Sequence, residues 1–106
     1  MADVAQHLGL DVGYVPEGCH PVGLGGDGRG RAFGAALECS GDATLRIERF
    51  DAESNDEELA ATPSETRAGR VEWRDEGTGD VIRVVSDELD VDALLRVADS
   101  IQVRGG

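Results

Sequence analysis

The sequence predicts an α+β fold in which an antiparallel sheet of about five strands carries a C-terminal helix on one face. Four segments place apolar residues with period two, which is typical of strands with one buried face, and a fifth is a short, largely apolar run. Near the C-terminus the apolar residues recur at helical spacing instead. With 106 residues, we expect residues 1–106 to form a single α+β domain.

Three strands are predicted in the first half of the chain. In the first, Leu8, Leu10, Val12 and Tyr14 alternate with glycine and aspartate. The second contains Gly34, which would cost a helix about 1 kcal/mol, and its apolar residues share one side at period two. Turns containing Pro16 or Ser40 separate the segments. The predicted strands span residues 8–14, 31–39 and 43–50.

Residues 22–30 contain five glycines and only Val22 and Leu24 as packing residues, so they predict a flexible hairpin-type loop. Their glycine spacing matches that of a dinucleotide-binding loop. However, Pro21 stands where a buried parallel strand would have to run, so we expect no nucleotide. Arg29 and Arg31 make a local positive spot and are candidate partner contacts.

The second half predicts two strands and two helices. Ser54 and Glu57 have the spacing of a capping box, which indicates a short helix near 55–61. Alternation predicts a strand at 70–74, and a hairpin loop at 75–80 joins it to a largely buried partner strand at 81–85.

The C-terminal helix is the clearest element. Asp90 can cap its start, and Gly105 fits its C-terminal cap. The apolar stripe that would pack on the sheet consists of Val91, Leu94, Leu95, Ala98 and Ile101.

Charge excludes several classes of function. The chain has 22 acidic residues, 10 arginines and no lysine, with a formal net charge of -12. A nucleic-acid-binding surface or one that attracts anionic lipid would need the opposite balance. No apolar run approaches the roughly 20 residues that span a bilayer, so we expect no direct membrane insertion. The composition fits adaptation to high salt or a GC-rich genome.

Cys19 and Cys39 are candidates for a disulfide, and the alternative is two buried thiols. A zinc site needs soft ligands, and the two cysteines together with His7 and His20 are residues of that kind. The adjacent pair Cys19-His20 would point to opposite faces of a strand, so no metal site is predicted. No cofactor and no catalytic residue is predicted either. Trp73 is a further candidate contact if it is exposed, but large aromatic residues are usually buried in the core.

The C-terminal Gly105-Gly106 is the end that ubiquitin-like modifiers use for conjugation, which leaves that function as one alternative. A small metal- or cofactor-dependent enzyme is the other. The favoured hypothesis is a non-enzymatic binding or sensory module that recognises a protein or a small ligand.

The last third of the chain carries a resemblance. Val71-Glu72-Trp73-Arg74, a glycine turn, the strand 81–86 and the helix 94–101 resemble a prokaryotic domain of unknown function. That domain occurs in the ectodomains of anti-sigma regulators and lipoprotein-sorting-like proteins, and PsbP-like lipoprotein domains share a comparable plan. The resemblance covers about half the chain and implies a fold, a binding role and a protein partner, but no catalytic residues.

The location depends on that resemblance. It implies the extracytoplasmic face of a membrane-anchored protein. Residues 1–7 have neither a positive segment nor an apolar stretch typical of a signal peptide. Without the resemblance we therefore expect a cytoplasmic chain.

Overall fold

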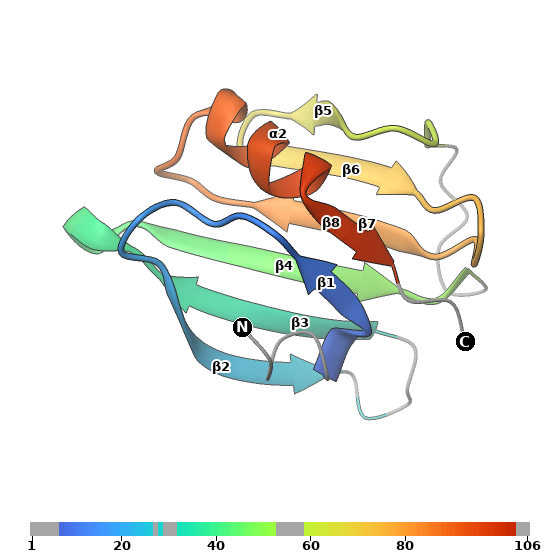
Figure 1. Ribbon diagram of the computed structural model, residues 1–106, viewed down its shortest axis with the longest axis horizontal. Helices are drawn as coiled ribbons and strands as arrows, with labels where there is room; N and C mark the ends of the chain where they lie inside the picture. Colours follow the sequence, from blue (N-terminus) through green and yellow to red (C-terminus); the bar gives the residue numbers. More distant parts are fainter. Residues whose placement is uncertain (1–6, 27, 29–31, 53–58, 104–106) are drawn as a thin grey trace.

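The computed structural model describes residues 7–26, 28, 32–52 and 59–103. Its architecture is α+β, as predicted, with a six-stranded antiparallel sheet in the order β2-β3-β4-β7-β6-β5 and a separate β1–β8 pair (Figure 1). The main sheet thus has six strands where about five were predicted. The elements are β1 (Leu10–Val12), β2 (His20–Gly26), β3 (Ala32–Glu38), the 3-10 helix η1 (Ser40–Asp42), β4 (Thr44–Phe50), β5 (Ser64–Arg67), β6 (Arg70–Arg74), β7 (Val81–Val85), α2 (Val91–Asp99) and β8 (Ile101–Val103).

The central strands form because their apolar residues alternate in register. Leu37 lies opposite Leu45, and Ile47 lies between Ala35 and Val84. These side chains are buried on one face of the sheet, against α2 and the β1–β8 pair. The predicted strands at 31–39, 43–50, 70–74 and 81–85 are confirmed to within two residues.

α2 begins where the sequence predicts, because the Asp90 carboxylate accepts a hydrogen bond from the Ala93 amide at 2.9 Å. It ends at Asp99, so the predictions that Ile101 belongs to the helical stripe and that Gly105 caps the helix are wrong. The Ser100 hydroxyl donates to Val97 O and accepts from the Tyr14 amide. Ile101 then pairs with Val12, and this tertiary pairing replaces the next helical turn.

Besides β8, two strands lie where the sequence predicts none. The flexible loop predicted for 22–30 is wrong as far as Gly26, because β2 pairs with β3 through backbone hydrogen bonds that need no side chains. β5, in the polar stretch before β6, pairs with β6 alone. In contrast, the predicted strand 8–14 shortens to Leu10–Val12, because His7 and Leu8 form a helical turn and Tyr14 lies outside any strand.

The capping-box residues Ser54 and Glu57 lie outside the described residues. The described end of the short helix predicted for 55–61 is not helical. Instead, Ala60 O accepts a hydrogen bond from the backbone amide of Arg74 at 2.9 Å, which aligns this segment with β6.

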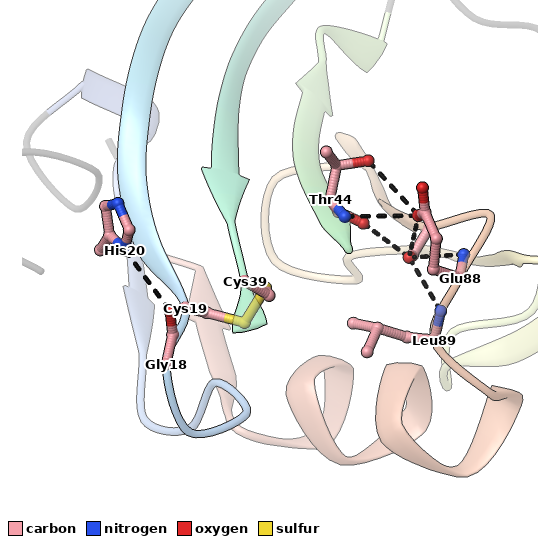
Figure 2. Close-up of a disulfide and its surroundings, with 8 residues drawn as sticks. Gly18, Cys19, His20, Cys39, Thr44, Glu88 and Leu89 are labelled. Atoms are coloured by element: carbon pink, nitrogen blue, oxygen red, sulfur yellow. Dashed lines mark hydrogen bonds between the residues drawn. A yellow bond between two sulfur atoms is a disulfide. The ribbon is translucent and has the colours of Figure 1, made fainter. Parts of the chain in front are cut away.

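A disulfide joins Cys19 to Cys39, which confirms the bonded alternative for the two cysteines (Figure 2). Cys19 directly precedes β2, and Cys39 directly follows β3. The bond therefore closes the open end of the β2–β3 hairpin and tethers β2 covalently to the sheet.

Candidate functional site

The two faces of the six-stranded sheet differ in what covers them. α2 and the β1–β8 pair lie on the same face (Figure 1). On the opposite face, which we call the open face, the described ranges place no helix or strand. Over β6 and β7, Glu72 and Val81 point to this face but are buried, so the part of the open face over β2, β3 and β4 is the candidate binding surface.

The size and charge of the side chains change across the open face. The residues contributed by β2 and β3 are mostly glycine and alanine, whereas β4, β7 and β6 contribute long charged and aromatic side chains. Strand register makes this visible in one row that crosses all six strands. In spatial order the row consists of Gly25, Gly34, Glu48, Arg83, Glu72 and Ser64.

The step from small to large residues creates a depression of about 480 Å³ over β2 and β3, which we call the hollow. Its floor is largely backbone, because the floor residues that point to the open face are glycine or alanine, whereas Leu24 and Phe33 alternate with them and point to the other face. Phe50, Glu48 and Arg46 of β4 stand along one side as a wall. The floor consists of Gly23, Leu24, Gly25, Gly26, Ala32, Phe33, Gly34, Ala35 and Ala36.

Two glycines of the floor are not required by the fold. A Cβ atom added at Gly23 or Gly25 would meet nothing within 4 Å, and neither residue has a positive φ. Gly26 differs, since its Cβ would lie 2.9 Å from Ala32 O. Glycine weakens a strand, and inside strands it often marks a close approach by a ligand or another backbone. The absent side chains at Gly23 and Gly25 keep the hollow empty without serving the chain's own packing.

The wall of the hollow is held from behind. The Arg83 guanidinium lies over the Phe50 ring, 4.6 Å from its centroid, and its Nη1 is 3.8 Å from Glu48 Oε1. Arg83 Nε is 3.5 Å from Glu72 Oε1. Arg83 therefore contacts the aromatic member of the wall by a cation–π interaction and the acidic member by an ion pair, while its Nε has no hydrogen-bond partner among the described residues.

Glu72 anchors this arrangement although it is only 2 % exposed. Its Oε1 accepts a hydrogen bond from the Thr66 hydroxyl at 3.0 Å and lies 3.5 Å from Arg70 Nη1. Within the described part of the chain, Glu72 Oε2 has no hydrogen-bond partner. Two arginines and a hydroxyl on one oxygen compensate the burial of this carboxylate.

A second depression of about 430 Å³ continues from the hollow, because Ala36 and Arg46 line both. We call it the acidic hollow, since Glu38, Asp42 and Asp87 line it with Arg46 as its only cation among the described residues. Among those residues, none of the three carboxylates forms an ion pair. Its negative charge is therefore available to a partner.

The end of the sheet beside the acidic hollow is fixed by several contacts (Figure 2). The disulfide holds β2 to β3 there, and His20 Nδ1 lies 3.4 Å from Gly18 O. On the other side, Glu88 Oε2 accepts hydrogen bonds from the Thr44 amide and from Ser86 Oγ. Glu88 is thus committed to a turn, in contrast to Asp87 beside it.

The outcome differs among the candidate site residues that the sequence predicts. Trp73 is 5 % exposed and lies in the core, the placement that its size favours. Arg29, Arg31, Gly105 and Gly106 lie outside the described residues. Cys19 and Cys39 are bonded to each other and so are not available to the His7 and His20 set.

Sequence reasoning missed the hollow. Its signal was the same glycine run that was interpreted as a flexible loop. Glycine residues in a strand and in a loop look alike in sequence, because a residue without a side chain shows no period-two pattern.

In the part of the chain that the structure describes, no three His, Cys, Asp or Glu residues are grouped so that they could hold a metal ion. No described helix has the length and apolar character needed to cross a membrane. Comparison of the chain with protein-family models, with curated proteins and with solved structures finds no match.

Proposed function

We propose that the protein is a non-enzymatic binding module that recognises a partner protein through the hollow on the open face of β2, β3 and β4. The observation that carries this proposal is the floor of the hollow, where Gly23 and Gly25 leave a space that the fold does not require. A cavity of about 480 Å³ is within the size range of binding sites.

The shape of the hollow favours a protein over a small ligand. Every residue of β2 is exposed, so the hollow is bounded by a floor and by the β4 wall but is open along the β2 edge. Small-molecule sites usually bury about 70–90 % of their ligand, which a floor and one wall do not achieve. A side chain projecting from a protein surface needs only these two contacts, because its own protein covers the rest.

The wall supports recognition by a protein side chain. Phe50 offers an aromatic surface, and Arg46 and Glu48 offer charges of both signs next to it. Because Arg83 and buried Glu72 hold the wall in place, a partner would not have to order it on binding. Such preorganisation lowers the entropic cost of association.

The disulfide supports a role in an oxidising compartment, where such bonds form and persist. This agrees with the extracytoplasmic placement that the resemblance to anti-sigma ectodomains implies.

Site-specific crosslinking tests the proposal. A photoreactive phenylalanine analogue would replace Phe50 in the wall of the hollow, which leaves the floor empty, or, as a control, Ser64 on β5. We expect one protein to crosslink in source cells from position 50 and not from position 64. The purified partner should bind the wild type and lose at least ten-fold in affinity for Gly25→Val, but not for Ser64→Val. Equal binding of both variants would refute the proposal.

A further inference from the structure

The outer edge of β2 is open for pairing. β2 is the last strand of its sheet and pairs with β3 on one side only, so alternate N–H and C=O groups face away from the sheet. Of the three large hydrophobic residues that are exposed in the described part of the chain, two lie on this strand, Val22 at 56 % and Leu24 at 45 % exposure. No Asp, Glu, Lys or Arg lies within His20–Gly26.

We infer that β2 accepts an extended segment of a partner protein as a seventh strand, with a bulky side chain in the hollow and a lysine or arginine at the acidic hollow. This inference rests on the proposed function and names the partner's recognition element. An extended peptide that joins a sheet edge gains affinity from main-chain hydrogen bonds and specificity from pockets for alternate side chains.

The hollow lies where such a strand needs a pocket. Neighbouring strands are spaced by about 4.8 Å, so alternate side chains of an added strand would lean over Gly23 and Gly25. A large aromatic or aliphatic side chain reaches across a glycine to the next strand, here Gly34 and Ala36. The Phe50 wall then limits how far it extends.

The charge of the protein indicates which kind of segment would pair with β2. The protein carries a net charge of -12, and Glu38, Asp42 and Asp87 line the acidic hollow at the His20 end of β2. A second copy of this chain would bring like charges together, whereas a cationic segment would be attracted. In the antiparallel orientation that this sheet uses throughout, the cationic residue would lie near the C-terminal end of the added segment.

One contact has to give way for pairing along the whole strand. His7 Nε2 donates a hydrogen bond to Gly25 O at 2.8 Å, and this bond is exposed. Pro21 has no N–H group, and a register shift follows it. The part of β2 that is best suited for pairing therefore runs from Gly23 to Gly26.

Selection of peptides tests the inference. The probe is a phage-displayed library of random 12-residue peptides, selected on the disulfide-bonded protein. We expect enriched peptides with alternating bulky apolar residues and a C-terminal Lys or Arg. Failure to enrich any peptide, or a change of the protein to a dimer through β2, would overturn the inference.

A backbone scan then separates strand addition from simple occupation of the hollow. The best peptide is synthesised with one N-methylated amide at a time, which removes a donor and leaves the side chains intact. Strand addition predicts a loss of at least ten-fold at every second position within the paired segment and little change between them. A scan without this alternation overturns strand addition.

Protein variants distinguish a failure of strand addition from a failure of the proposed function. Gly25→Val and Gly23→Val should each weaken peptide binding at least ten-fold while the protein stays folded by circular dichroism, and Ser64→Val should bind like the wild type. If binding needs Gly25 but the backbone scan is flat, the hollow is still a binding site and only strand addition is wrong. If binding ignores both glycine variants, the proposed function fails as well.

Discussion

The two edges of the six-stranded sheet are built in opposite ways. β5 has four residues, carries Glu65 and Arg67, and contains a register shift. β2 has seven residues and no charged side chain, and its obstacles to pairing are Pro21, the bulge at Val22 and the exposed hydrogen bond from His7 to Gly25 O. One sheet thus has a protected edge and an open one, so the exposure of β2 does not follow from the fold as such.

The open face shows the same asymmetry. On the β5 side, a buried carboxylate ties β5, β6 and β7 together through Thr66, Arg70 and Arg83. On the β2 side, glycine and alanine leave space, and a disulfide supplies the connection that side chains do not. The anchoring side-chain contacts thus lie in one half of the sheet and the proposed binding surface in the other.

The largest effect is expected at the anchor of the protected half. Glu72→Ala would remove the buried carboxylate shared by Arg70 and Arg83 and leave Arg83 with Glu48 as its acidic partner, and it should lower the free energy of unfolding by about 3–5 kcal/mol. Urea unfolding measures this loss. The control Glu65→Ala, on exposed β5, should change it by less than about 0.5 kcal/mol. Equal effects would show that Glu72 is not the anchor.

Loss of the disulfide should affect the open half. Replacing Cys19 and Cys39 by serine should cost about 3 kcal/mol, because the unfolded chain regains the freedom of the loop between them. We expect the β2 amides to exchange hydrogen well before those of β7, since β2 then depends on β3 alone. Simultaneous opening of both strands would contradict the difference between the two halves.

A smaller effect separates two neighbouring glycines of β2. Gly26→Val should lower the free energy of unfolding by about 1–3 kcal/mol, because its Cβ would crowd Ala32 O. Gly25→Val should leave it unchanged or raise it by up to about 1 kcal/mol, since nothing lies near its Cβ and glycine weakens strands. Thermal unfolding of the pair checks this, and a destabilised Gly25→Val would mean that the fold does need that glycine.

The smallest changes in stability are expected when a charge is added to the open edge strand β2 or removed from the protected edge strand β5. Leu24→Lys and Arg67→Leu should each alter the free energy of unfolding by less than about 0.5 kcal/mol. Self-association in light scattering should nevertheless rise for Arg67→Leu and stay at the wild-type level for Leu24→Lys, because a charge on an edge strand opposes pairing. A rise for both variants would contradict the edge comparison.

Sequence patterns predict the protected half better than the open one. Val81–Val85 and Val91–Asp99 are recognisable because their apolar residues must meet the core at fixed spacing. β5 escapes detection because it is short and polar on both faces. β2 escapes because pairing through the backbone leaves no trace in a run of glycines.

The candidate site was predictable only in part. Pairing of the two cysteines was open from their spacing and became definite when β2 and β3 placed them side by side. The hollow depends on register, which puts Gly25 opposite Gly34 and next to Glu48. Register is set by long-range strand pairing, which no local pattern in the glycine segment reports.

The Cys19–Cys39 bond also determines how mechanical load would pass through the molecule. Tension applied to a segment bound at β2 would first act on the backbone hydrogen bonds between β2 and β3. The covalent bond transfers that tension to β3, which is paired with β2 on one side and β4 on the other. An edge strand that could otherwise be peeled away thereby gains the resistance of the sheet interior.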